Sequence, residues 1–575
     1  MKLLFFLGFL LCLTCSLSEV CTNDQAPNNC KFTVIGGGFG GLYSAFRAYN
    51  SSLYQPQDIC IFEKTDRVGG RAYSVRNVFP ITPSVDIGAH RYDRVIHRIM
   101  SSIVNILGLN TRCYSKTLDC VVNDDSYFFL RNSYSGNLAT SQGIPYFLNK
   151  NEQWKSNTSP PNPSDDIINM YPFYSLMYNN LTSLDPSVRY PTIRQALEML
   201  RNYQVNGLYP NQMDIKSALP GYSSELWYLY EDVIGESPSI LHINLYDVMR
   251  FNILYALDDV VGEQLNVITD SLGNEVGYAT VPETLASYLT SKCVNLSYNK
   301  EAAGLYKNND GSIKVTFSDG TSIDTDNVIL NIPQRELLQL SHDSVIFTHA
   351  STNQTLIYKL FNAIPAVKAY GFYSDNWWNK LLGITMAELA TTEFVRYFEY
   401  TDSNYQCSGN KCPGYVNIAY PDDTFYRYFS TPRTDETDPL VVIYSNTTDL
   451  VQKRWLNDVT ASFIKSQTGI FASKNVNPSL LPALQILVMG VWNAAWHQSP
   501  IYKDFRGGDI SKAMLNPVPG VPIYVANEAF SVDQGWAEGS LIAAEKILYK
   551  YFGLNRPSWL ADSYWHDAII KYEYV

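Results

Sequence analysis

The chain has 575 residues, of which 46% are apolar and 17% are charged, and this composition excludes general disorder and predicts two or more domains with ample core. Its formal net charge is −12, so it lacks the basic character of proteins that bind nucleic acid. We therefore expect a folded, acidic protein with no nucleic acid partner.

The N-terminus has the layout of a signal peptide. Lys2 is followed by an apolar run from Leu3 to Leu13 and by small residues at Ser16 and Ser18. This run is shorter than the roughly 20 apolar residues that a membrane-spanning helix needs, and no later segment is apolar enough. We expect residues 1–18 to be removed, the protein to be secreted, and no stable membrane insertion.

Cysteines and glycosylation motifs agree with export. Two of the ten cysteines lie in the leader, and an oxidising compartment could pair the other eight. Cys407 with Cys412, and Cys113 with Cys120, are close enough in sequence to close loops. The eight contain no C-x-x-C motif and lack clustered histidines, so we expect no metal site. N-glycosylation sequons occur at Asn50, Asn157, Asn180, Asn295, Asn353 and Asn446.

A glycine-rich stretch, Lys31–Gly41 (KFTVIGGGFGG), follows the leader. Its first residues predict a buried strand, and the apolar run from Leu42 to Tyr49 predicts a helix. Between them, Gly36, Gly38 and Gly41 fit G-x-G-x-x-G, which suits a tight turn, a close approach to a pyrophosphate and close helix–strand packing. The motif alone fits a plain glycine-rich turn equally well.

The next apolar run, Ile59–Phe62, predicts a second strand that ends in Glu63. An acid about 20 residues beyond such glycines is expected to bind ribose hydroxyls. This spacing favours a dinucleotide with free ribose hydroxyls.

Two further motifs carry a family resemblance. TDRVGGRAYSV places Gly69 and Gly70 before Arg71, and VDIGAHRY places Gly88 before Arg91. The combination resembles the flavin-dependent amine oxidases of the glutathione-reductase-like FAD group, in which a GGR segment lies against the cofactor diphosphate. The resemblance implies an oxidoreductase with FAD as cofactor. Across roughly residues 31 to 550, the order of segments is similar to that of secreted L-amino-acid oxidases of the molluscan-secretion and venom type.

The middle of the chain alternates between helix and strand patterns. Helices are predicted over residues 94–107, 192–203, 223–234 and 245–257, and the family resemblance implies a turn and a helix over 277–289. Strands are predicted over 313–317, 327–330, 366–373 and 414–419, and a hairpin over 127–137 with its turn at Ser135 and Gly136. The stretch 151–166 is rich in Pro, Ser and Asn and predicts a linker.

The C-terminal portion is expected to return to the cofactor. A strand at Ile523–Val525 precedes Glu528, a loop with Gly535 and Trp536, and an Ala-rich helix from Glu538 to Leu548. The resemblance implies that this strand, acid and helix contact FAD. The resemblance also implies that the Gly535 carbonyl faces the substrate amine and that the Trp536 ring forms one wall of the pocket.

The predicted fold class is α/β. It comprises a discontinuous Rossmann-like FAD-binding domain, an α+β substrate-binding domain and a mostly helical insertion at the substrate entrance. We place the FAD-binding domain at residues 31–105, 265–335 and 510–555, the insertion at 110–260 and the substrate-binding domain at 336–505.

The resemblance implies a set of cofactor-binding residues in the glycine turn, the two later motifs and the C-terminal portion. They are Gly36, Gly38, Gly40, Gly41, Glu63, Lys64, Gly70, Arg71, Gly88, Ala89, His90, Arg91, Glu528, Trp536 and Ala537.

It also implies the substrate contacts. Arg91 would form a two-pronged salt bridge with the substrate carboxylate, a task that suits a guanidinium. Tyr400 would bind the same carboxylate, with Tyr397 as the alternative, and Lys368 would hold a water beside the flavin. Ordinary structure offers other roles: Arg91 could pair with a nearby aspartate (Asp86 or Asp93), and Tyr400 could be plain packing.

Two departures from the family leave the function open. Asn527 adds a side chain where relatives have glycine, and VWNAAWHQSPIYKDFRGG keeps Trp492 without a clear match to the glycine and aromatic residue that follow in the family. We expect an oxidase of L-amino acids that uses molecular oxygen and yields hydrogen peroxide. A flavin amine or polyamine oxidase and an inactive secreted FAD-binding defence protein are the alternatives. A homo-oligomer is left open.

Overall fold

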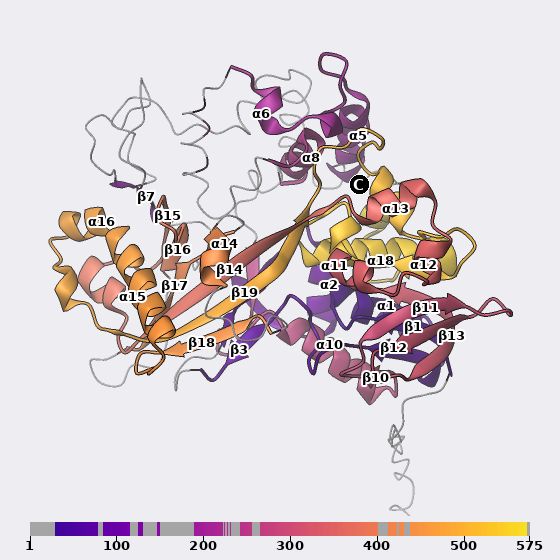
Figure 1. Ribbon diagram of the computed structural model, residues 1–575, viewed down its shortest axis with the longest axis horizontal. Helices are drawn as coiled ribbons and strands as arrows, with labels where there is room; N and C mark the ends of the chain where they lie inside the picture. Colours follow the sequence, from indigo (N-terminus) through magenta and orange to yellow (C-terminus); the bar gives the residue numbers. More distant parts are fainter. Residues whose placement is uncertain are drawn as a thin grey trace, which may run out of the picture.

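The computed structural model describes most of the chain after its first residues (Figure 1). The described residues are 29–78, 84–114, 125–129, 147–149, 189–221, 224, 227, 231, 242–255, 265–400, 412–422, 425–430 and 438–571. The predicted hairpin turn, the predicted linker and most of the helix predicted over 223–234 lie outside these residues.

A 7-stranded sheet gathers strands from three distant parts of the chain, in the order β10-β2-β1-β13-β12-β11, with β20 also pairing with β13. Strands β10, β2, β1, β13 and β20 pair in parallel, whereas β11, β12 and β13 pair antiparallel. The strands are β1 (Asn29–Ile35), β2 (Ile59–Phe62), β10 (Asn295–Ser297), β11 (Ala302–Lys307), β12 (Ile313–Phe317), β13 (Ser322–Leu330) and β20 (Ile523–Val525).

Helices cover both faces of this sheet. Phe32 and Val34 of β1 share a buried cluster with α1 (Phe39–Asn50), α2 (Arg98–Ile106), α10 (Thr280–Ser291), α18 (Ala537–Phe552) and η10 (Trp565–Ile570). Ile35 and Phe62 face a second cluster with α11 (Gln334–Gln339), α12 (Val345–Thr348), α13 (Thr352–Tyr358) and α17 (Asp509–Met514). A mainly parallel sheet buried on both faces is the doubly covered arrangement of α/β proteins.

An 8-stranded sheet forms the second part, in the order β18-β19-β14-β17-β16-β15-β7-β8. Its strands are β7 (Asp125–Phe129), β8 (Phe147–Asn149), β14 (Asn362–Tyr373), β15 (Ala387–Thr391), β16 (Tyr397–Tyr400), β17 (Gly414–Ala419), β18 (Leu440–Tyr444) and β19 (Leu484–Gln498). In Figure 1 the long strands β14 and β19 run from this sheet towards the first part.

The two faces of β14 have different partners, because side chains alternate along a strand. Val367 packs in a cluster with α15 (Leu450–Lys465) and α16 (Thr468–Ser473). Tyr370 packs with Val85 and Ile87, at and just after β4 (Ser84–Asp86), which pairs with β3 (Ser74–Arg76). Lys368 is two residues before Tyr370 on β14, so its side chain lies on the same face of the strand and faces the first part of the molecule.

A helical cluster joins α5 (Arg189–Asn202), α6 (Ile215–Ala218) and α8 (Leu245–Tyr255). Strand β9 (Leu265–Thr269) lies between β5 (Tyr92–Asp93) and β6 (Asn110–Cys113) in a 3-stranded sheet. Strands β6, β7 and β8 fall in the stretch predicted as mostly helical. The α/β fold class is confirmed, and the domain limits stay a proposal.

Two local features differ from the sequence predictions. The helix predicted from residue 94 begins at Arg98, because the Asp93 side chain accepts hydrogen bonds from the backbone N–H groups of Val95 and Ile96 (both 2.7 Å) and holds a turn there. A disulfide joins Cys30 to Cys60 on neighbouring strands, a pair that loop length did not indicate. Cys113, Cys293 and Cys412 are also disulfide-bonded, while Cys120 and Cys407 lie outside the described residues.

Candidate active site

The glycine turn connects β1 to α1. Gly36 has φ of +103°, and a Cβ there would lie 2.3 Å from the Asn331 carbonyl oxygen, so only glycine fits. A Cβ on Gly41 would lie 2.1 Å from the Gly36 oxygen. Gly38 is the N-cap of α1 and provides no side-chain cap. The turn therefore leaves the first amides of the helix open to an anion.

Glu63 directly follows β2 and lies beside this turn. Its buried carboxylate accepts hydrogen bonds from the N–H of Gly37 (2.8 Å) and the N–H of Thr65 (2.9 Å). Lys64 points the other way, with its Nζ 3.6 Å from Glu336 and its side chain 45% exposed. The structure thus brings Glu63, and not the Lys64 side chain, to the glycine turn.

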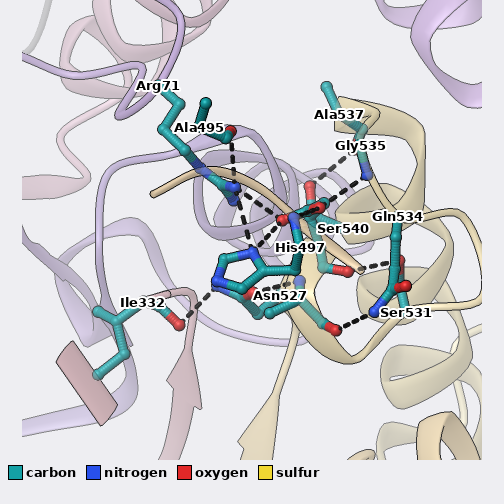
Figure 2. A network of polar contacts seen from close by, with 12 residues as sticks. Arg71, Ile332, Ala495, His497, Asn527, Ser531, Gln534, Gly535, Ala537 and Ser540 are labelled. Atoms are coloured by element: carbon teal, nitrogen blue, oxygen red, sulfur yellow. Dashed lines mark hydrogen bonds and ion pairs between the residues drawn. The ribbon is translucent and has the colours of Figure 1, made fainter. Parts of the chain in front are cut away.

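Arg71 links the GGR segment to the C-terminal portion (Figure 2). The Gly69 N–H donates to the Gly37 carbonyl at 2.9 Å, which places GGR beside the glycine turn, while Gly70 is exposed with φ of +56°. Arg71 Nη1 lies 2.7 Å from Glu528 Oε2 and 3.2 Å from the Ala495 carbonyl. Segments far apart in sequence therefore meet in one ion pair.

Glu528 is the centre of this network. Its carboxylate accepts from the backbone N–H of His497 (3.1 Å) and of Gly535 (2.7 Å), and it contacts His497 Nδ1 at 2.9 Å. Burial by itself would raise the pKa of Glu528, but Arg71, His497 and the Gly535 N–H together bring that pKa well below its ordinary value. Glu528 is therefore a buried, ionised carboxylate.

Lys368 meets the GAHR segment from the second sheet. Its buried ammonium donates to the Gly88 carbonyl at 2.8 Å and to His90 Nδ1. Burial, then Lys368 and Arg91, hold the pKa of His90 well below its ordinary value, so His90 is neutral and accepts this bond. The Ala89 N–H donates to the Arg71 carbonyl at 3.0 Å, which joins this group to the GGR segment.

Arg91 lies against Tyr114 and Glu399. The guanidinium carbon is 4.6 Å from the centre of the Tyr114 ring, and the Tyr114 hydroxyl donates to Glu399. Burial, then Glu388, raises the pKa of Glu399 to about 8, although Tyr114, Arg91 and Lys368 oppose the rise. The aspartates suggested as partners of Arg91 accept other bonds: Asp86 from Ser74 and the Tyr278 N–H, and Asp93 from two backbone N–H groups.

The structure does not bring Tyr400 to this group. Tyr400 is 1% exposed and packs among Trp377, Trp378 and Phe463 on the α15 face of the sheet. Residues alternate along β16, so its neighbour Glu399 takes the site face instead. Tyr397 shares the parity of Glu399, and its ring lies 6.3 Å from the Tyr420 ring, over which Lys368 Nζ lies at 5.2 Å.

The Gly535–Trp536–Ala537 loop lies at the start of α18. Gly535 has φ of +84° and its N–H donates to Glu528. Trp536 is the N-cap of α18, with its ring centre 4.6 Å from that of His97, and Ala537 opens the helix. The loop is therefore tied to the same carboxylate as Arg71.

The structure places Asn527, the added side chain, and Trp492, the retained residue of the altered segment. The Asn527 side chain folds back, donating to the Ile332 carbonyl (2.5 Å) and accepting from the Ala529 N–H (2.6 Å). Trp492 donates from Nε1 to the Ile87 carbonyl at 2.6 Å, which anchors β19 to the segment before Gly88. The added amide is therefore occupied by the backbone.

Comparison with known proteins decides the family. The family model of flavin containing amine oxidoreductases matches residues 52–420. The chain belongs to this family. This amine oxidoreductase is 20% identical to Aplysianin-A of Aplysia kurodai, over 94% of its own length and 93% of the relative's. It is 21% identical to Achacin of Lissachatina fulica, over 95% and 98% of the two lengths.

Solved structures show the same fold. Putrescine oxidase bound to putrescine superposes with a TM-score of 0.56 at 12% identity, covering 92% of this chain and 99% of that one. Its family membership makes the protein a flavin-dependent oxidoreductase, with FAD as its cofactor.

The residues present fit that cofactor. The glycine turn has no space for side chains, the N-terminus of α1 has no side-chain cap, and the GGR segment lies beside the turn through the hydrogen bond from the Gly69 N–H to the Gly37 carbonyl. Within the described ranges, His, Cys, Asp and Glu form no group of three or more that could hold a metal ion. No helix in the described part of the chain has the length and apolar character to span a bilayer.

Sequence reasoning missed Tyr114, Glu399 and His497. The strand alternation in Tyr397–Tyr400 could have revealed Glu399, because it separates that residue from Tyr400. Tyr114 and His497 carry no motif, since only the tertiary fold brings them to Arg91 and Glu528.

Proposed function

We propose that this amine oxidoreductase is a secreted oxidase of L-amino acids. The overall reaction converts the amino acid, molecular oxygen and water to a keto acid, ammonia and hydrogen peroxide. When bound, FAD would supply the redox chemistry: a hydride, which carries both electrons, would leave the amine-bearing carbon for the flavin, and the two electrons would then pass to oxygen. The protein itself binds and orients the substrate and excludes water.

One observation carries the amino-acid assignment. Arg91 lies in the same short segment as Gly88 and His90, which Lys368 holds from the opposite sheet. A guanidinium at that position suits a substrate carboxylate, and the Tyr114 ring beneath it limits its orientation. A simple amine offers no group for Arg91 to bind.

The neighbouring acid supports this assignment. With its pKa near 8, Glu399 is mostly uncharged at neutral pH, so it does not compete with the substrate carboxylate for Arg91. Lys368 is fixed by Gly88 and neutral His90, which suits the family role of holding a water beside the flavin. Glu399 is buried and His90 is half-buried, so this side of the pocket is partly shielded from water.

A peroxide-coupled assay tests the proposal. Purified holoprotein is offered the common L-amino acids, their D-enantiomers and a set of mono-, di- and polyamines. Turnover of L-amino acids supports the proposal, whereas turnover of amines alone would establish the amine oxidase alternative. Stopped-flow mixing separates the inactive alternative, because a protein that has lost turnover would keep its oxidised flavin spectrum with every compound.

Export is part of the proposal. The leader at residues 1–18, the disulfide between Cys30 and Cys60, and the exposed sequons at Asn50, Asn353 and Asn446 support it. Expression in a secretory host tests it. Recovery of the protein only inside the cells, with its leader intact, would contradict it.

A further inference from the structure

A cavity of about 240 Å³ lies between α17, α18 and η10, and neither the cofactor site nor the substrate contacts account for it. Its lining comes from α17, from the end of β20 and the residues that follow, from one face of α18, and from η10. An engineered protein cavity of roughly 150 Å³ binds benzene, so this cavity has room for a larger ligand.

The cavity is separate from the FAD cleft. Gly539, Ala543 and Lys546 line it, and their helical spacing puts them on one face of α18. Glu545 lies on a different face and pairs with Arg47 of α1 at 2.8 Å, so the helix that follows the glycine turn packs on that other face. Within the described residues, neither the glycine turn nor the GGR segment lines the cavity.

One end of the cavity, beside the first turn of α18, is apolar. A Cβ on Gly539 would lie 2.2 Å from the Asp533 carbonyl oxygen, so the segment that contains Phe530 and Val532 lies against this turn. Both of these side chains line the cavity, as does Ile542 one turn farther along α18. Further apolar lining residues are Met514, Leu515, Val525, Ala543, Ile569 and Ile570. Covering such a surface with an alkyl chain is favourable, because it removes apolar area from water.

The other end is basic. Lys546 and Lys550 line the cavity about two and three turns beyond Gly539, and Lys512 lines it from α17. Burial raises the pKa of Tyr551 and the Lys512 charge opposes that rise, so Lys512 lies near the same end of α18. The described lining contains no Asp or Glu, although the chain has a net charge of −12. This end therefore suits an anion.

Lys546 is the lysine best placed to hold that anion. It is only 9% exposed, so water screens its charge less than it screens a surface lysine. Each ammonium has several N–H donors, so the three lysines can bind a ligand and keep other contacts.

The separation of the two ends selects an elongated ligand. Gly539 and Lys550 are roughly 16 Å apart along the helix axis. An alkyl chain with a terminal carboxylate meets both ends, whereas a compact anion would leave the apolar end without contact. We propose that this cavity binds the anion of a medium-chain fatty acid, with its carboxylate at Lys546 and its alkyl chain towards Phe530. The site does not depend on the substrate class of the oxidase.

Isothermal titration calorimetry of the full-length holoprotein tests the proposal with octanoate and with octanol, its neutral analogue. We expect one saturable site for octanoate and binding of octanol at least about tenfold weaker, because octanol lacks the charge-assisted hydrogen bond.

Three variants locate the site. Lys546→Met should weaken octanoate about 10-fold and leave octanol within about twofold, because only the charge is lost. Ala543→Phe fills the middle of the cavity and should abolish binding of both compounds. Lys474→Met, at an exposed lysine, is the matched control and should equal wild type. The flavin absorbance should be unchanged in all three, since the cavity is separate from the FAD cleft.

Absence of saturable octanoate binding to the wild type would overturn the proposal. Octanol that binds as tightly as octanoate, or unchanged octanoate affinity in Lys546→Met, would overturn the recognition of the carboxylate. Unchanged binding in Ala543→Phe would place the ligand outside this cavity. Octanoate binding that appears only in a chain ending at Lys571 would identify residues 572–575 as the occupant and would also overturn the proposal.

Discussion

Replacing Arg91 with alanine tests the proposed substrate class most directly. Removing one partner of a desolvated charge pair costs about 2–5 kcal/mol, and about 1.4 kcal/mol corresponds to a tenfold change. Arg91 is only partly buried, beside half-buried His90 and buried Glu399, so the lower half of that range applies. We expect kcat/KM for the best amino acid to fall on the order of 100-fold. The FAD content should hardly change.

The sharpest assay pairs that amino acid with its decarboxylated amine. Arg91→Ala should lose activity towards the amino acid and little or none towards the amine, because only the amino acid carries the carboxylate. Arg91→Lys should recover part of the loss, since an ammonium keeps the charge without the two-pronged geometry. Arg454→Ala, at a side chain that is 86% exposed, controls for loss of an arginine as such. Near-normal amino-acid turnover by Arg91→Ala with full flavin would refute the reasoning.

Other substitutions test the cofactor turn, the lysine, the acid and export. The FAD content of Gly36→Ala should be at least tenfold lower than that of the wild type, measured as the ratio of absorbance at 450 nm to that at 280 nm. The reason is that φ at Gly36 is +103° and the new Cβ would lie 2.3 Å from a backbone oxygen. Lys368→Met should lower kcat at least about 10-fold with FAD retained, since the family role needs a hydrogen-bonding ammonium; unchanged kcat would contradict that role. The wild-type KM for amino acids should rise as the pH passes about 8, because ionised Glu399 then competes for Arg91, and Glu399→Gln should lack this rise. A KM profile identical in both proteins would refute the competition. Mass spectrometry of the secreted protein should find Glu19 as the first residue and glycans on Asn50, Asn353 or Asn446.

Periodicity and spacing could predict the cofactor sheet because its signals are local. The strand after Cys30, the glycines with their one permitted backbone geometry, and Glu63 at the end of β2 lie within a short stretch of sequence. The family resemblance then predicted that the strand Ile523–Val525 returns to the cofactor sheet, and the parallel pairing of β20 with β13 confirms this. The disulfide between Cys30 and Cys60 was not predictable in this way, since it depends on β1 and β2 being neighbours.

The substrate side was harder to predict because it depends on which face of a strand meets the first sheet. Tyr400 and Glu399 are adjacent in sequence, and a motif cannot distinguish them without the partner on each face. The structure supplies those partners: α15 and the tryptophan pair cover Tyr400, while Tyr114 covers Glu399.

One altered residue bonds the Glu528 carboxylate and the other is its neighbour in sequence, and this bears on whether catalysis is retained. His497 belongs to the altered segment and Asn527 to the altered strand end, yet both make specific bonds beside Glu528, which still binds Arg71 and the Gly535 N–H. A site that had lost its cofactor would not need an ionised carboxylate buried here, because a buried charge is costly unless it is paired and hydrogen-bonded. His497 contributes to that hydrogen bonding, and Asn527 bonds the neighbouring backbone without contacting the carboxylate. We therefore interpret the substitutions as a different way of holding FAD, and favour an active oxidase over an inactive binding protein.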